Sequence, residues 1–433
     1  MTVSAPSRTT NGRPIAVAAT PASAVVPDVA PTEVADASVV SAIDSVVQAP
    51  TAPVLIAPAA VGGGTGVAVG RPATSPLDWR TLVGLPGVRF AAQQITDASS
   101  GTASMAGARA LRTHNNVSIA LDFDSLVSWR GFRAYAQHKT RTGRNGSDEA
   151  SFVQNYSNID AADFNSFGEV FVEQKLFSDK LRVKVGRLDF NAEFAATDHS
   201  GSFLNASMGY SPAITAAPTF PLPVAAVNVF VNARDNLTLS VGFFDGSPSA
   251  PSSTANGSRF QIAQANQSWS LGSQQLAGRF GVGAWRHTGL FLAADDADDT
   301  EPHVQGTRGW YSTFDQTLWQ GAAHKEGDDA KPVIAAYVQV GRALPDVQAV
   351  HEHEGAGLTF SGLFARRASD LFGLGVTHAA WAGGHETIGE IYYQLPIISH
   401  LSVVADYQSV RRQDSAFDMR SGSVFTMRTI LTF

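Results

Sequence analysis

The 433-residue chain has no cysteine, and only 16% of its residues are charged. The absence of cysteine excludes disulfides and metal sites built on thiolates. Soluble domains carry charge on roughly 25% of their residues. The composition is therefore unlike that of an average soluble domain.

Long apolar runs and positive charge are also lacking. No stretch approaches the roughly 20 uncharged apolar residues that a membrane-spanning helix needs. The formal net charge is -7 and the chain has no basic cluster, which argues against a nucleic-acid partner. The motifs G-x-S-x-G and H-E-x-x-H do not occur, so the sequence predicts no catalytic residue, no enzyme and no cofactor.

From about residue 85 the chain consists of short alternating segments separated by polar, Gly-rich breaks. Residues 116–124, 236–244, 387–395 and 401–407 each place apolar side chains on one face and mostly polar ones on the other. Period-two alternation predicts β-strands. Roughly 350 residues at about 20–22 per strand and connector predict an all-β, antiparallel outer-membrane β-barrel of about 16 strands.

The last segment, residues 423–433, alternates in the same way and ends on an aromatic residue. Phe425, Met427, Thr429, Leu431 and Phe433 share one face, and Arg428 lies on the other. In a soluble protein such an edge strand would favour aggregation. As the closing strand of an outer-membrane barrel it is expected, with its apolar face toward lipid and Arg428 toward the lumen.

Connector lengths predict which end of the barrel is which. Short breaks at 366–369 and 396–399 alternate with longer ones at 343–355 and 411–422. Outer-membrane barrels have short periplasmic turns and longer extracellular loops. An even strand number then places both ends of the barrel in the periplasm.

Residues 1–80 differ from the rest of the chain. They are rich in Ala, Val, Pro, Ser and Thr, and nearly free of aromatics before Trp79. With no persistent periodicity and no convincing apolar core for a signal peptide, this leader is expected to be disordered. It is either a periplasmic spacer or a segment outside the mature protein, and the barrel domain is expected at 81–433.

Two regions carry recognisable motifs. Residues 167–210 contain K-V-G-R-L-D at Lys184–Asp189 and F-L-N at Phe203–Asn205. Residues 306–408 contain R-G-W-Y-x-x-x-D-Q at Arg308–Gln316, E-T-x-x-E-x-Y-Y at Glu386–Tyr393 and A-D-Y-Q at Ala405–Gln408. In this order the blocks resemble the OprB-type carbohydrate-selective porins, over about residues 85–433.

The resemblance implies passive, carbohydrate-selective diffusion of mono- and oligosaccharides through a water-filled barrel. Sugars are neutral and rich in hydroxyls, so a selective lumen needs hydrogen-bond donors, acceptors and aromatic plates. Charges on the lipid face are costly, which places the charged residues inside. The candidate pore-lining residues are Arg133, Glu169, Glu173, Arg182, Lys184, Arg187, Asp189, Glu193, Glu390 and Asp406.

These residues leave alternatives open. The charges can equally be cross-lumen pairs that brace the barrel wall. A second inward row is formed by Arg133, Tyr135, Gln137 and Lys139. Trp285, Trp310 and Trp319 can be stacking plates for sugars, although interfacial girdles are the favoured interpretation.

No metal site is expected. His351–Glu354 lies in a predicted extracellular loop and lacks a third fixed ligand. The acidic residues at 295–301 lack the spacing and central Gly of a calcium loop, and a solvated loop near lipopolysaccharide explains them.

The sequence is also compatible with other functions. They are a general or organic-acid-selective porin, a barrel enzyme such as a lipase or protease, and a soluble β-rich glycan-binding protein. For the porin, the expected partners are sugars as permeants, outer-membrane lipid and lipopolysaccharide. The barrel-assembly machinery is expected to bind the Phe433 strand, and the porin to be a monomer or homotrimer.

Overall fold

The computed structural model describes residues 86–246, 257–294, 304–322, 331–347, 349–364, 367–414 and 417–433. The predicted leader at 1–80 and the acidic segment at 295–301 lie outside these residues. Among the described residues, no helix is long and apolar enough to cross a membrane.

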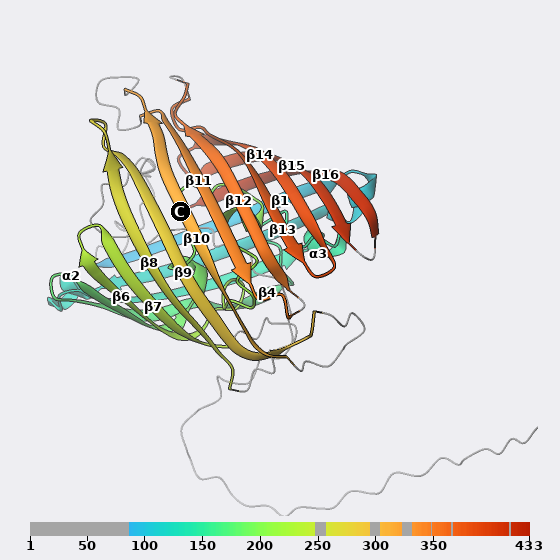
Figure 1. Ribbon diagram of the computed structural model, residues 1–433. Coiled ribbons are helices and arrows are strands. Elements are labelled where there is room, and N and C mark those ends of the chain that lie inside the picture. Colours follow the sequence, from blue (N-terminus) through green and yellow to red (C-terminus); the bar gives the residue numbers. More distant parts are fainter. Residues whose placement is uncertain are drawn as a thin grey trace, which may run out of the picture. The chain divides into compact units, whose positions relative to one another are not determined.

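Within the described residues, sixteen antiparallel strands form one closed barrel, in which each strand pairs with its neighbours in the chain (Figure 1). This confirms the predicted fold and strand number. The first eight strands are β1 (Val88–Gly101), β2 (Ala110–Asp122), β3 (Phe132–Gly143), β4 (Phe164–Leu176), β5 (Leu181–Leu188), β6 (Val224–Arg234), β7 (Leu237–Asp245) and β8 (Arg259–Leu271). The others are β9 (Leu276–Phe291), β10 (Val304–Gln320), β11 (Val333–Ala343), β12 (Val350–Ser361), β13 (Leu371–Trp381), β14 (Gly384–Ile398), β15 (Leu401–Asp414) and β16 (Phe417–Thr432).

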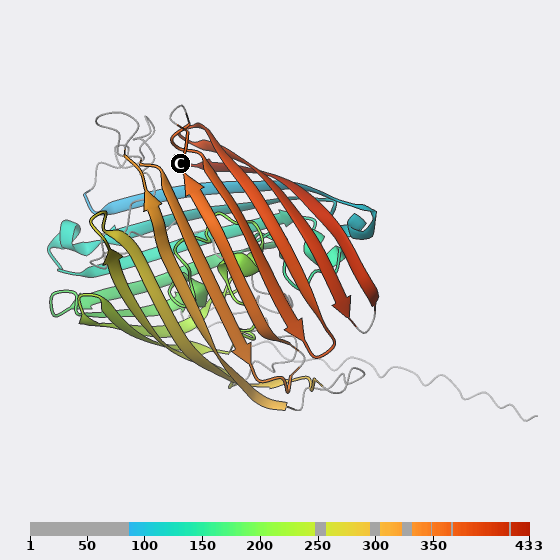
Figure 2. The same cartoon turned by 45° about the horizontal axis from the view of Figure 1, so that its top comes forward.

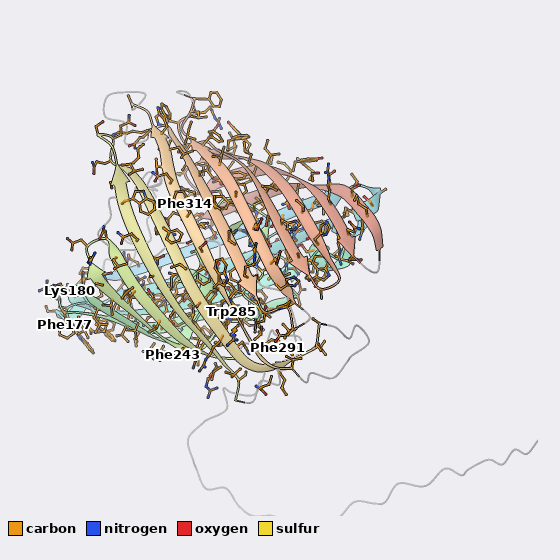
Figure 3. The ribbon with its side chains drawn as sticks, viewed as in Figure 1. Phe177, Lys180, Phe243, Trp285, Phe291 and Phe314 are labelled. Atoms are coloured by element: carbon orange, nitrogen blue, oxygen red, sulfur yellow. The ribbon has the colours of Figure 1, made fainter. Side chains whose placement is uncertain are left out.

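The alternation of the sequence corresponds to the two faces of the barrel wall. In β7, Leu239 and Phe243 are 44% and 53% exposed, whereas Ser240 between them is buried. Figure 3 shows Phe243 and Phe314 on the outside of the wall, and both are exposed. The apolar face of β7 therefore points outward, as a lipid-facing barrel requires.

The two rims of the barrel carry different connections. The rim where odd-numbered strands lead into even-numbered ones, called here the loop rim, bears the long connections 144–163 and 189–223. The opposite turn rim has tight connections at 177–180, 235–236 and 399–400, and the chain also ends there. Long loops mark the extracellular side of such barrels and short turns the periplasmic side.

Near the C-terminus the predicted connector lengths are wrong. Residues 411–414 and 417–422 belong to β15 and β16, so the expected long loop at 411–422 is mostly strand. Residues 350–355 likewise belong to β12, and 396–398 to β14. Their polar side chains resemble a loop in sequence, but they continue the strand pairing toward the rims.

The barrel closes between its first and last strands (Figure 2). The alternation of β16 is as predicted, with Phe425, Met427 and Phe433 exposed and Arg428 buried on the inner face. Arg428 Nε donates to Asp97 Oδ1 of β1 at 2.7 Å, and its Nη2 donates to Oδ2 at 2.8 Å. This paired fork is the strongest hydrogen-bonding geometry available to arginine, and it fixes the seam.

Candidate functional site: the loop-filled lumen

The long connections of the loop rim turn back into the barrel. The first inner loop, residues 144–163, contains the short helix α3 (Gly146–Glu149). The second inner loop, residues 189–223, contains the 3-10 turn η2 (Phe190–Ala192) and the short helix α4 (Ala206–Gly209). Both are contacted by inward-facing side chains of the wall, and coil segments lie inside the ring of strands in Figures 1 and 2.

The first inner loop lies over the seam. Glu386 of β14 accepts hydrogen bonds from the backbone N–H of Gln154 at 2.7 Å and of Val153 at 3.4 Å. Arg112 Nε of β2 lies 2.7 Å from Asp160 Oδ1, and Ser157 Oγ donates to Asp97 at 2.7 Å. The loop is therefore tied to strands on both sides of the closing pair.

The second inner loop crosses the lumen and is held by wall carboxylates. Glu390 of β14 accepts the N–H of Leu204 at 2.6 Å and of Asn205 at 3.1 Å. Asp315 of β10 accepts the N–H of Asp198 at 2.8 Å and of His199 at 3.2 Å. A buried backbone N–H costs free energy when it has no hydrogen-bond partner. Each of these carboxylates therefore stabilises the loop by accepting two such groups.

An aromatic cluster packs the same loop against the wall. Phe190 and Phe194 of the loop are fully buried, and their rings lie against inward side chains of β6 to β8. The ring centroids of Phe190 and Phe260 are 5.4 Å apart, and those of Phe194 and Phe230 are 5.9 Å apart. Apolar packing thus fills part of the lumen and narrows it.

Five of the predicted pore-lining residues meet in one charged network beside this cluster. Arg182 Nη2 lies 2.8 Å from Glu193 Oε2, and Arg182 Nη1 lies 3.0 Å from Glu173 Oε2. Lys184 Nζ lies 3.1 Å from Glu169 and 3.3 Å from Glu193. Glu193 therefore ties the second inner loop to β5, whose two cations also pair with β4.

Burial on its own would raise the pKa of Glu193. The charges of Lys184 and Arg182 and their hydrogen bonds outweigh that effect, and together they lower the pKa of the Glu193 carboxyl to about 2. Glu193 is therefore ionised at neutral and at mildly acidic pH, and the network keeps its charges.

Three other predicted residues have structural partners. Asp189 is buried and accepts hydrogen bonds from Thr219 Oγ1 at 2.7 Å and from the Phe220 N–H at 3.0 Å. Asp406 accepts from Gln408 Nε2 at 2.9 Å, and Glu390 anchors the second inner loop as described. These three residues hold the second inner loop and the wall in place.

The remaining two predicted residues are cations without an ion pair among the described residues. Arg133 of β3 lies with its guanidinium 5.8 Å from the centroid of the Tyr135 ring, and its Nε is buried without a hydrogen-bond partner. Arg187 of β5 pairs in register with Val170 and Ala225, whose side chains are exposed. It follows Gly186, whose φ of 150° interrupts the regular strand, and its Nε is buried without a hydrogen-bond partner.

The model of a protein family described as "Carbohydrate-selective porin, OprB family" matches residues 108–433. The chain belongs to the OprB family. It is a carbohydrate-selective porin of the Gram-negative outer membrane, and its family and fold indicate a channel rather than an enzyme. A comparison with curated proteins gives no significant match.

Solved structures show the same fold. The porin is similar to the high-pH structure of Pseudomonas putida OprB, with a TM-score of 0.68 and 17% identity over 82% of this chain and 97% of that one. For the low-pH structure of the same protein the TM-score is 0.54, with 16% identity over 83% of this chain and 97% of that one. At this identity the likeness concerns the fold alone.

Two further sequence-based placements differ from the structure of the porin. Trp285 is not in a girdle, because it is buried inside the barrel and stacks on Phe260 with centroids 6.0 Å apart; Trp310 and Trp319 are exposed on the outer face, as a girdle requires. His351–Glu354 lies in β12 rather than in a loop. Within the described residues, no group of three or more His, Asp or Glu residues is placed to hold a metal.

Sequence reasoning missed the anchoring roles of Asp315 and Glu386. Both stand in motif blocks of the family, and both fall on the inward face by alternation. The signal available in the sequence was a carboxylate on the inner face of a strand. Arg279 and Arg412 stand beside these carboxylates in register, and Arg279 Nη2 lies 3.3 Å from Asp315 Oδ2. Backbone N–H groups of the inner loops occupy the remaining acceptor positions.

We expect the Glu193→Gln variant to lose sugar selectivity, and the difference from the native porin to be as large at pH 4 as at pH 7. Because the pKa of the Glu193 carboxyl is lowered from 4.5 to about 2, the group keeps its charge at pH 4 and loses it only as the pH falls toward 2. Sugar permeation into proteoliposomes at the two pH values measures this. A difference that shrinks at pH 4 would show that Glu193 titrates normally.

We expect Glu390→Leu to release the second inner loop, whereas Glu390→Gln keeps an acceptor for at least one N–H group. Leaving these buried donors unpaired costs about 1–3 kcal/mol each, so the loop should leave the lumen for part of the time. Single-channel conductance should then rise and fluctuate in Glu390→Leu only. Equal conductance in both variants would contradict the anchoring role.

Proposed function

We propose that this porin selects sugars on the lumen wall formed by β3, β4 and β5. The proposal rests on one observation: two neighbouring rows across these strands differ in chemistry. Arg133, Glu173 and Lys184 are paired in register in one row. In the next row Tyr135 pairs with Phe171, and their rings stack with centroids 5.0 Å apart.

The two rows match the two faces of a sugar. Arg133 offers a fork of donors with no competing carboxylate in an ion pair, and Glu173 and Glu193 offer acceptors that the network holds in place. The aromatic row offers apolar contact for the ring face of a pyranose. Within the set predicted from sequence, Arg133, Glu169, Glu173, Arg182, Lys184 and Glu193 form this pathway, whereas Asp189, Glu390 and Asp406 position the loops that confine it.

Arg133, which has no ion pair among the described residues, also bears on the alternative of an organic-acid pore. Arg133 would attract a carboxylate as readily as it donates to a hydroxyl. A neutral sugar and its acid counterpart must therefore be compared in the same assay.

We expect Arg133→Met to slow glucose entry relative to a neutral polyol of similar size. Loss of one hydrogen bond of about 1 kcal/mol corresponds to about a fivefold change in affinity. Liposome swelling with the purified porin measures the rates, with sodium gluconate as the charged solute. Arg130→Met, a change in an exposed turn-rim residue, is the matched control.

Three outcomes of this assay are informative. Failure of the native porin to admit glucose faster than protein-free liposomes would contradict sugar transport. Faster entry of gluconate than of glucose would favour the organic-acid pore. Equal effects of the Arg133 and Arg130 variants would place selection elsewhere.

We also propose that the β16 strand is the segment by which the barrel-assembly machinery recognises this chain, and that the outward face contacts lipid and lipopolysaccharide. Phe433 ends the chain at the turn rim, 46% exposed, with its ring stacked on His400 at 6.1 Å. Removal of Phe433 should lower the amount of folded barrel in outer membranes, seen as the form that migrates differently before and after heating. An unchanged amount of folded barrel would contradict this role. Phe425→Ala, which changes another residue on the same face of β16, is the control.

A further inference from the structure

The outer face of β8 to β11 carries four arginines near the loop rim. They are Arg259 of β8, Arg286 of β9, Arg308 of β10 and Arg342 of β11. Alternation along the strands directs them away from the lumen. Arg286, for example, is exposed and stands between Trp285 and His287, which are buried on the inner face.

The first and last of these arginines have carboxylate partners on the same face. Arg259 Nη1 lies 3.1 Å from Asp245 Oδ1 of β7, and Arg342 Nη2 lies 2.5 Å from Glu354 Oε1 of β12. The charge of each is therefore balanced by the neighbouring strand.

The two central arginines differ from their neighbours. Arg286 and Arg308, called here the arginine pair, stand directly opposite each other in register, and both are exposed. Arg286 Nε donates to the neutral amide Oε1 of Gln261 at 2.6 Å. Neither guanidinium has a carboxylate partner in the part of the chain that the structure describes. Like charges directly opposite on neighbouring strands are unfavourable, so an anion bound between the two would stabilise the pair.

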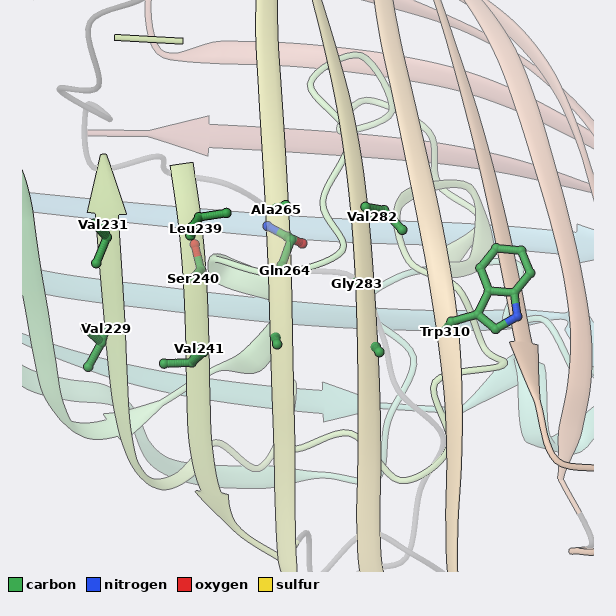
Figure 4. Close-up of a pocket in the computed structure, with 12 residues that line it drawn as sticks. Val229, Val231, Leu239, Ser240, Val241, Gln264, Ala265, Val282, Gly283 and Trp310 are labelled. Atoms are coloured by element: carbon green, nitrogen blue, oxygen red, sulfur yellow. The ribbon is translucent and has the colours of Figure 1, made fainter. Parts of the chain in front are cut away.

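The outer face is hollowed next to the arginine pair, on the side toward the middle of the membrane. Figure 4 shows this hollow over β6 to β10. Its floor contains the small residues Ala263, Ala265 and Ala284, and the larger side chains around them are Val229, Val231, Leu239, Val241, Val282 and Trp310. All of these side chains are apolar except for the indole N–H, so the hollow suits a hydrocarbon chain.

The register connects the hollow to the arginine pair. Trp310 and Ala284 line the hollow and are paired with each other in the row next to that of Arg308 and Arg286. Residues two apart on a strand are about 7 Å apart. Two cations near the loop rim therefore stand directly above an apolar hollow, an arrangement that fits a lipid with an anionic head and acyl chains.

The position of the pair indicates which lipid this is. The loop rim is the extracellular side of the barrel, and the outer leaflet of a Gram-negative outer membrane consists of lipopolysaccharide. Its lipid A carries phosphates on a sugar backbone, with the acyl chains below. Arginine binds phosphate through paired N–H groups. Phospholipids of the inner leaflet would instead place their phosphates near the turn rim.

We propose that the arginine pair and the hollow form a binding site for the lipid A part of lipopolysaccharide. A phosphate binds between Arg286 and Arg308, and an acyl chain lies in the hollow over Ala263 and Ala265. This site rests on the proposed contact of the outward face with lipopolysaccharide and makes that contact specific to one part of the barrel.

The role of the phosphate is tested with Arg308→Gln. Arg411→Gln is the matched control, because Arg411 of β15 is also exposed on the outer face near the loop rim, with the neutral partners Thr387 and Ser421 in register. The purified, folded porins are titrated with lipopolysaccharide and with the same material after removal of its lipid A phosphates. We expect the native porin and Arg411→Gln to bind the phosphorylated form several-fold more tightly, and Arg308→Gln to lose this preference.

The role of the hollow is tested with Ala265→Phe, which fills the floor without changing the charge. We expect it to weaken the binding of both forms of lipopolysaccharide several-fold. Ala98→Phe, a change of an exposed alanine on β1, should leave binding unchanged. The heat-dependent gel shift of a folded barrel shows whether each variant is folded.

Several results would overturn the site. They are equal affinity of the native porin for the two forms, equal losses in Arg308→Gln and Arg411→Gln, and equal losses in Ala265→Phe and Ala98→Phe. Phosphatidylglycerol that competes as well as lipopolysaccharide would overturn the assignment to lipid A. Lipopolysaccharide that binds all variants equally would overturn the site and leave the general contact of the outward face in place, so the two proposals fail separately.

Discussion

The interior of this porin depends on carboxylates of the wall that bind backbone N–H groups of the loops. A loop inside a barrel takes its peptide groups away from water, and each unpaired group is costly. Glu386, Glu390 and Asp315 resolve this by accepting two N–H groups each. The lumen is narrowed because these anchors exist, and the charged network is in place because the second inner loop brings Glu193 to Arg182 and Lys184.

The barrel could be predicted from the sequence because its constraint is local and repetitive. Every strand must alternate to face lipid on one side, and a single segment such as 236–244 shows that pattern without reference to the others. The charged block of β4 and β5 could be predicted for the same reason, since its charges are excluded from the lipid face. Strand ends were predicted less well, because the polar side chains of 411–422 stand where strands extend toward the rims.

The inner loops could not be predicted in this way. Phe190, Phe194 and Phe203 occupy no period, so the sequence does not show that they pack against the wall. Their partners lie far along the chain, as with Leu204 and Glu390, and only the closed barrel brings them together.

The seam between β1 and β16 has a consequence for the order of assembly. Arg428 and Asp97 are 331 residues apart in the chain, and the first inner loop adds Ser157 and Asn158 to the same cluster. Closure of the ring therefore joins the earliest strand, an internal loop and the latest strand in one step. The contacts that hold this loop are therefore complete only when β16 has paired with β1, so closure of the barrel and fixation of the loop in the lumen depend on each other.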